Sequence, residues 1–183
     1  WMLEELNLNY EPVKINMREK EHKGEAYLKL NPNGKVPCLT DGNFVIWESI
    51  AINNYLADKY SPHLLGDTPE SRALVLQWNL WSMLELQRPI IDIFIQKVFV
   101  PEDKRDHALI EKCQKTCLPL LSILDSALNA KKYLVNETFT IADLNMASVV
   151  NITAAIQMDI SSYKNIKAWL GNMIERPAYQ KYS

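Results

Sequence analysis

The chain has 183 residues, 48% of them apolar, and this length and composition suit one domain or two small ones that bury a core. Its 20 lysines and arginines nearly match its 22 aspartates and glutamates and form no blocks, which argues against nucleic-acid binding as the main function. No apolar run reaches the roughly 18 residues of a membrane-spanning helix, and no signal peptide is visible. The three cysteines lack paired spacing, which is typical of a reducing compartment. We therefore expect a cytoplasmic protein with no membrane or nucleic-acid partner.

The first 60 residues mix helical and strand patterns. Trp1–Leu8 has the composition of a helix in mid-course, from which we expect more chain upstream. Apolar and polar residues alternate over Tyr10–Asn16, which predicts a short strand, and Pro12 suits an edge position because it cannot donate to a sheet ladder. One or two helical turns are expected over Glu25–Leu30, before a turn at Asn31–Gly34.

A β-hairpin is predicted after this turn. Its strands are Val36–Thr40 and Phe44–Trp47, separated by the turn signal Asp41-Gly42-Asn43. Pro37 has no N–H for a ladder and is one of the few residues that can follow a cis peptide bond, so the Val36-Pro37 step suits a sharp, rigid turn. Such a turn can leave the backbone of Val36 free to bond a ligand.

A helix is predicted directly after the second strand, over Glu48–Lys59. Its first N–H groups have no intrahelical partner and carry the positive end of the helix dipole. The helix start at Glu48 and Ser49 is therefore a potential seat for a carboxylate.

Residues 61–69 contain two prolines and a glycine, which is the composition of a linker, and we place the domain boundary there. Beyond this boundary only helices are predicted. Ser71–Phe99 is apolar almost all round and contains Pro89, which should kink or break the helix. Glu102–Ala130 contains Pro119 as a second expected kink.

The clearest local signal in the second half is Thr140 with Asp143 three residues later, a pair that can satisfy free backbone donors at a helix start. Loss of Asp143 should therefore cost about 1 kcal/mol or more. The helix that begins there, Ile141–Ile156, is apolar on every side, so we expect it at the centre of a helical domain. A last helix is predicted over Ile166–Glu175.

Several motifs occur in a familiar order. They are the turn Asn-Pro-Asn-Gly-Lys-Val-Pro, the Glu-Ser start of a helix, the Ser-x-Ala-Ile-x-Asn-Tyr-Leu pattern, the Thr-x-x-Asp box and a terminal Arg-Pro-Ala-Tyr. Together they resemble the cytosolic glutathione transferase family. The resemblance implies an α+β thioredoxin-like domain over residues 1–60 that lacks its first strand, a linker over 61–69, and an all-α helical bundle over 70–183.

The resemblance also implies a glutathione site. The backbone of Val36, before Pro37, would pair with the cysteinyl part of glutathione. Glu48 and Ser49 would hold the γ-glutamyl end, with the serine hydroxyl and N–H on its carboxylate and the glutamate on its ammonium. Lys35 would approach the glycyl carboxylate.

The reaction implied by the family is transfer of the glutathione thiolate to a small hydrophobic electrophile, with glutathione as co-substrate and no other cofactor. A thiol near its ordinary pKa is mostly protonated at neutral pH, so a donor must stabilise the thiolate. In the family this donor is a hydroxyl or a cysteine between the first strand and the first helix, which would precede Trp1. A homodimer is implied, and Arg88 is a candidate for the electrophile pocket.

Simpler interpretations exist for each of these residues. Pro37 can be purely structural, Ser49 can be only a helix N-cap, and Lys35 can be a solvated turn residue. Cys38 lies in an apolar strand and is interpreted as core. The pair formed by Cys113 and Cys117, also interpreted as core, lacks the nearby histidine or acid that would complete a zinc site.

Two other functions remain open at this point. The same scaffold can serve as a non-catalytic interaction protein, because function depends on sites and not on the fold. A cysteine upstream of Trp1 would instead favour a glutathione-dependent thiol reductase. The residue that follows the first strand would discriminate between these functions and transfer.

Overall fold

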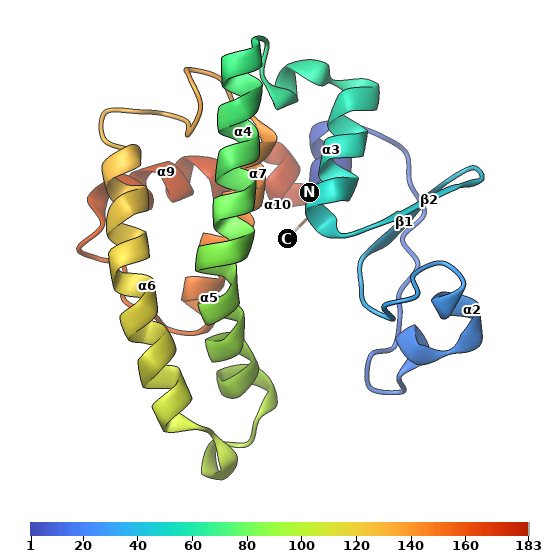
Figure 1. The fold of residues 1–183 in the computed structure, drawn as a ribbon, viewed down its shortest axis with the longest axis horizontal. Coiled ribbons are helices and arrows are strands. Elements are labelled where there is room, and N and C mark those ends of the chain that lie inside the picture. Colours follow the sequence, from blue (N-terminus) through green and yellow to red (C-terminus); the bar gives the residue numbers. More distant parts are fainter. Residues whose placement is uncertain (183) are drawn as a thin grey trace.

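The computed structural model describes residues 1–182, which form a small mixed part and a larger helical part that lie next to each other (Figure 1). The small part runs from α1 to α3 and the helical part from α4 to α10. Ser183, the last residue of the predicted helical domain, lies outside the described residues. The elements of the small part are α1 (Met2–Glu5), the 3-10 turn η1 (Glu21–Lys23), α2 (Glu25–Leu28), β1 (Cys38–Asp41), β2 (Phe44–Trp47) and α3 (Ser49–Tyr60).

The predicted hairpin is confirmed. Strands β1 and β2 pair antiparallel, with Cys38 opposite Trp47 at one end and Asp41 opposite Phe44 at the other. Gly42 follows with a φ of 59°, a left-handed conformation that favours glycine in a hairpin turn. The first strand begins at Cys38, two residues later than predicted, because the prolyl nitrogen before it has no hydrogen for the ladder.

The strand predicted over Tyr10–Asn16 is wrong. Among the described residues this segment pairs with no other strand, and the sheet consists of β1 and β2. A cavity of about 560 Å³ separates the stretch around Tyr10 from β1, with Leu39 and Thr40 on its far wall. Alternation alone cannot make a strand, because the ladder hydrogen bonds need a neighbour within about 5 Å.

The helical part begins after the 3-10 turn η2 (Pro62–Leu65), which occupies much of the predicted linker. Its elements are α4 (Pro69–Trp81), the π-helical segment η3 (Ser82–Leu86), α5 (Gln87–Phe94), the π-helical segment η4 (Ile95–Phe99), the 3-10 turn η5 (Glu102–Lys104), α6 (His107–Ala127), α7 (Ile141–Val150), α8 (Ile152–Ala155), α9 (Lys164–Ile174) and α10 (Pro177–Tyr182). In Figure 1, the α4–α5 rod and α6 run side by side.

The helix predicted over Ser71–Phe99 is interrupted near Pro89, as expected. The interruption is the π-helical segment η3, which ends three residues before the proline. Because Pro89 cannot donate to a carbonyl one turn earlier and its ring crowds that carbonyl, a widened turn relieves the clash. Pro119, by contrast, lies inside α6, which continues as one α-helix on both sides of the proline.

Asp143 holds the start of α7, as the capping signal predicts. Its carboxylate accepts the backbone N–H of Thr140 at 3.1 Å. It also accepts the N–H of Leu134 at 2.8 Å and the indole N–H of Trp169 at 3.0 Å, two contacts that the sequence does not indicate. Burial raises the pKa of Asp143, and these hydrogen bonds oppose the rise.

The core lies mainly in the helical part. Every residue of α7 except Ser148 is buried, and α7 contacts α3, α4 and α9. This confirms the central position predicted for the helix, although it ends at Val150 and the short α8 follows. The largest fully buried side chains all belong to the helical part and include Leu86, Ile90 and Trp169. No helix in the described part of the chain combines the length and apolarity needed to cross a membrane.

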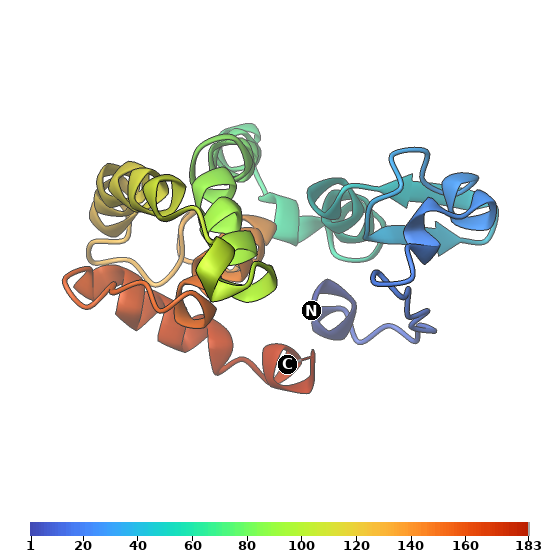
Figure 2. The same ribbon diagram turned by 90° about the horizontal axis from the view of Figure 1, so that it is seen from below.

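The two ends of the chain meet where the two parts join. Figure 2 shows α1 beside α10, and α1 belongs to the small part although its partner belongs to the helical part. Arg176 forms two hydrogen bonds with the Glu5 carboxylate, at 2.7 and 2.8 Å, and Lys181 pairs with Glu4 at 2.5 Å. The guanidinium also stacks on Phe139, at 3.7 Å from the ring centre.

Candidate functional site

Two side chains hold the turn that carries Lys35 and the cis Val36-Pro37 peptide bond in place through hydrogen bonds to its backbone. The Lys35 carbonyl accepts hydrogen bonds from the Tyr27 hydroxyl at 2.8 Å and from the Asn31 amide at 2.6 Å. The side-chain carbonyl oxygen of Asn31 accepts a hydrogen bond from the backbone N–H of Asn33 at 3.0 Å. Both anchoring side chains are buried, so the backbone just before the cis peptide is held in one place.

The backbone of Val36 is available to a ligand. Among the described residues its N–H and C=O make no hydrogen bond, and the residue is 46% exposed. An adjacent N–H and C=O on an extended segment can pair with a peptide as one more strand would. The geometry therefore agrees with the ligand contact predicted for Val36.

The hairpin register brings the two halves of the predicted site to the same edge. Cys38 and Trp47 form the last pair at that end of the hairpin, and paired residues lie roughly 5 Å apart. Pro37 immediately precedes the first of them and Glu48 immediately follows the second. The free backbone of Val36 and the start of α3 thus flank one end of the sheet.

The start of α3 presents polar groups to solvent. Glu48 occupies the N-cap position with a φ of 72°, and Ser49 is the first helical residue, so the interpretation of Ser49 as N-cap is wrong. Both side chains are exposed and make no hydrogen bond among the described residues. Positive φ is uncommon for a residue other than glycine and is often found at functional sites. The first N–H groups of a twelve-residue helix provide a favourable place for a carboxylate.

A second cavity, of about 180 Å³, lies between α3 and the helical part, and Ser49 forms part of its wall. The opposite wall is formed by residues of η3, α5, α7 and α8. Most of the lining is polar: Ser49, Asn53, Ser82, Gln87, Asn145 and Ser148. The cavity thus joins the candidate site to the domain interface.

Arg88 does not line this cavity. Its guanidinium pairs with Asp92 one turn further along α5, at 3.1 Å, and its side chain is 79% exposed. Its neighbour Gln87 lines the cavity instead. A role of Arg88 in an electrophile pocket stays a prediction.

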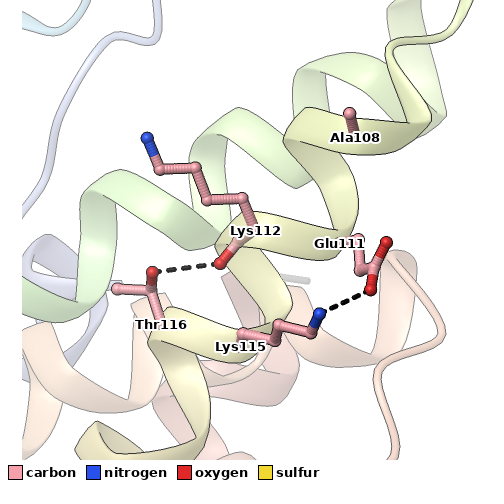
Figure 3. Close-up of a pocket in the computed structure, with 5 residues that line it drawn as sticks. All are labelled: Ala108, Glu111, Lys112, Lys115 and Thr116. Atoms are coloured by element: carbon pink, nitrogen blue, oxygen red, sulfur yellow. Dashed lines mark hydrogen bonds and ion pairs between the residues drawn. The ribbon is translucent and has the colours of Figure 1, made fainter.

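A further hollow, of about 510 Å³, lies on the surface of α6 (Figure 3). All of its lining residues belong to this one helix, and several of them interact with each other. The Lys115 ammonium donates to the Glu111 carboxylate at 2.6 Å, and the Thr116 hydroxyl donates to the Lys112 backbone carbonyl at 3.0 Å. Because all of the lining is local to one exposed helix face, the hollow provides no converging free groups and is a poorer candidate than the hairpin edge.

Cys113 and Cys117 are core residues, as predicted, whereas Cys38 is only half-buried and borders two cavities. Cys113 and Cys117 are buried in α6 and Cys38 is half-buried in β1. Burial raises the pKa of the Cys38 and Cys113 thiols, and raises the pKa of Cys117 to about 11. Thiols with raised pKa values are protonated at neutral pH and are weak nucleophiles.

The sequence did not indicate two residues that support the site. Tyr27 and Asn31 reach the Lys35 carbonyl from positions eight and four residues earlier in the chain. An asparagine before a Pro-Asn-Gly turn is a signal for local side-chain to backbone bonding, and it could have identified Asn31. No comparable pattern marks the tyrosine.

Comparisons with known proteins find relatives that match both parts of the chain. Residues 1–58 match the glutathione S-transferase N-terminal domain family, and residues 87–177 match the glutathione S-transferase C-terminal domain family. Glutathione S-transferase 1 of Zea mays is 32% identical over 184 residues, which cover 98% of this chain and 86% of the maize protein. Glutathione S-transferase GstB of Escherichia coli (strain K12) is 31% identical over 182 residues, which cover 98% of this chain and 88% of the bacterial protein.

Solved structures show the same fold. A theta class glutathione S-transferase from Xanthomonas axonopodis pv. citri, crystallised with glutathione bound, superposes with a TM-score of 0.93 at 34% identity and covers 99% of this chain and 87% of its own. Glutathione S-transferase-I bound with lactoylglutathione superposes with a TM-score of 0.89 at 32% identity. The superposition covers 98% of this chain and 88% of the glutathione S-transferase-I chain. The superpositions thus extend over both parts of the chain.

Proposed function

This chain belongs to the glutathione S-transferase family, with a thioredoxin-like N-terminal domain and a helical C-terminal domain, and we propose that it binds glutathione at the end of the hairpin where Val36 and Ser49 lie. The activity is that of a glutathione transferase. The proposed domains are residues 1–60 for glutathione binding, 61–69 as linker and 70–183 as the helical domain.

Each part of glutathione has a partner in this proposal. The free N–H and C=O of Val36 pair with the cysteinyl residue, in the geometry of an added strand. The hydroxyl and N–H of Ser49 take the γ-glutamyl carboxylate at the positive end of α3, and Glu48 meets the ammonium. Lys35, exposed on the anchored turn, attracts the glycyl carboxylate. The observation that carries the proposal is the register, which places Pro37 and Glu48 on either side of one strand pair.

The reaction transfers the sulfur of glutathione to a small hydrophobic electrophile. The thiol loses its proton, the thiolate forms a carbon–sulfur bond, and in a substitution the leaving group departs with its electron pair. The polar groups at the hairpin edge bind and orient the tripeptide, which lowers the entropic part of the barrier. We propose that the hydroxyl or thiol that stabilises the thiolate precedes Trp1, and that glutathione is the co-substrate without a further cofactor.

We also propose that the protein forms a homodimer in the cytoplasm. Four apolar side chains remain exposed along α4 and η3, at spacings of about one helical turn from Leu76 through Leu80 to the adjacent pair Met83 and Leu84, and a second copy would cover them. Such a continuous apolar stripe is typical of a protein interface. A reducing compartment suits the free thiols of Cys113 and Cys117.

The double variant Glu48→Ala/Ser49→Ala tests the site. Hydrogen bonds to charged groups contribute about 1.5–3 kcal/mol each, so its affinity for glutathione should fall at least about tenfold. Isothermal titration calorimetry of the full protein with glutathione measures this directly.

The matched control is Glu111→Ala/Thr116→Ala, which removes the same two kinds of side-chain group from the α6 hollow and should leave the affinity unchanged. Equal affinity for the Glu48/Ser49 variant and the unaltered protein would count against the site.

A further inference from the structure

Three asparagine side chains form a continuous hydrogen-bonded chain between the two domains. The Asn53 amide in α3 donates to the Asn145 carbonyl oxygen in α7 at 2.6 Å. The Asn145 amide in turn donates to the Asn79 carbonyl oxygen in α4 at 2.9 Å. We call Asn53, Asn145 and Asn79 the asparagine relay. It links the helix that begins with Ser49 to two helices of the helical domain.

Two of the three relay residues are buried in the helical domain. Asn79 is 1% exposed and Asn145 is 7% exposed, and every other buried residue of α7 except Asp143 is apolar. The Asn79 Nδ2 group has no hydrogen-bond partner among the described residues. A buried donor without a partner costs about 1–3 kcal/mol, and apolar side chains of similar size in such places are often neutral or stabilising. Stability therefore does not explain the relay.

The position of the relay connects it to the candidate glutathione site. Asn53 lies four residues after Ser49, so both project from the same face of α3. Ser49, Asn53 and Asn145 line the same cavity of about 180 Å³. A hydrogen bond at Asn53 therefore limits the rotation of α3 about its own axis, and this rotation sets the direction in which Ser49 points.

We propose that the asparagine relay positions Ser49 for glutathione by fixing the orientation of α3 against the helical domain. The relay residues are positioning residues, since they contact other protein groups and not the reacting atoms. A buried asparagine that specifies the register of packed helices at a cost in stability is known from coiled coils. This inference rests on the proposed glutathione site and adds the means by which the helical domain controls it.

The test is the triple variant Asn53→Leu/Asn79→Leu/Asn145→Leu of the full protein. Leucine has the same branching and the same number of side-chain heavy atoms as asparagine and needs no hydrogen-bond partner, so we expect the variant to stay folded. The affinity for glutathione, measured by calorimetry, should fall about tenfold, because small misplacements of a binding group have effects of this size or larger. The rate constant at saturating glutathione should change much less than the KM for glutathione.

Asn54→Leu is the matched control. Asn54 is the next residue of the same helix, and its amide donates at 2.8 Å to the Ile50 carbonyl within α3, with no hydrogen bond from its side chain to the described residues of the helical domain. This variant should bind glutathione like the unaltered protein. Asn53→Leu alone, at a half-buried position, should reproduce the loss of affinity and keeps the test decisive if the triple variant fails to fold.

The outcomes are distinct. Folded relay variants that bind glutathione as tightly as the unaltered protein would overturn the positioning role, and a lower melting temperature with unchanged affinity would assign the relay to stability alone. An unaltered protein that does not bind glutathione would overturn the proposed function itself, and this inference with it.

Discussion

Asp143 illustrates how one buried side chain can organise several segments. A capping signal links only residues three positions apart, which is why the sequence predicts this contact. The structure adds bonds from Leu134 and Trp169, so the same carboxylate also fixes the loop before the helix and the packing of α9. The expected effect of its loss is therefore larger than that of an ordinary cap.

We expect Asp143→Ala to lower the free energy of unfolding by about 3 kcal/mol, because it leaves buried donors without partners, at about 1–3 kcal/mol each. Burial of the charge, which raises the pKa of Asp143, offsets part of this loss. Urea denaturation measures the change.

Thr68→Ala provides the comparison, since Thr68 caps α4 by accepting the Ser71 N–H at 3.2 Å, and its side chain accepts no hydrogen bond from another segment of the described chain. Its cost should be near 1 kcal/mol. Equal losses for the two variants would show that the bonds from Leu134 and Trp169 contribute nothing.

The residues of the candidate site and of the proposed asparagine relay also divide into those that a local sequence pattern predicts and those that it does not. Val36 and Ser49 belong to short motifs, so a turn and a helix start mark them in the sequence. Asn53 and Asn145 are 92 positions apart, and each looks like an isolated polar residue in an apolar helix. Only packing brings them together, and no local pattern encodes that pairing.

Secondary-structure elements follow the sequence where their hydrogen bonds are local. The hairpin and α7 match their predictions because turn residues and caps act within a few positions. The segment Tyr10–Asn16 does not form a strand, since its hydrogen bonds depend on a neighbour that alternation cannot supply. Pro89 correctly marks a disturbance, but the π-helical form of that disturbance depends on how the carbonyls of the preceding turn are satisfied.

The contact between α1 and the C-terminal helices should depend on pH. Burial acts to raise the pKa of Glu5, but the hydrogen bonds from Arg176 and Trp1 outweigh it and leave the pKa below the ordinary value of 4.5. A carboxylate with a lowered pKa in the folded state stabilises the protein above its unfolded pKa. This stabilisation is lost as the pH falls through the folded pKa.

We therefore expect the melting temperature of the unaltered protein to fall more steeply from pH 6 to pH 3 than that of Glu5→Gln, which cannot lose this charge. Scanning calorimetry at several pH values provides the measurement. Glu25→Gln is the control, because Glu25 pairs with Lys29 on an exposed surface and should change the slope little. Parallel curves for Glu5→Gln and the unaltered protein would contradict a role for this ion pair.

The two domains have different tasks in this protein. The small domain provides the free backbone of Val36 and the start of α3, and the helical domain provides most of the core and the far wall of the cavity beside Ser49. The sequence motifs predict the fold class and the family, because the order of short signals along the chain is specific. The way in which the domains meet follows from side chains distant in sequence, such as Glu5 with Arg176.

The most direct test is a titration of the 15N-labelled full protein with glutathione, followed by NMR. The amide signals of Val36 and Ser49 should shift together and saturate at the same glutathione concentration, while those of Lys112 and Thr116 beside the α6 hollow stay in place. Unchanged signals at Val36 and Ser49, or shifts confined to α6, would contradict glutathione binding at the hairpin edge.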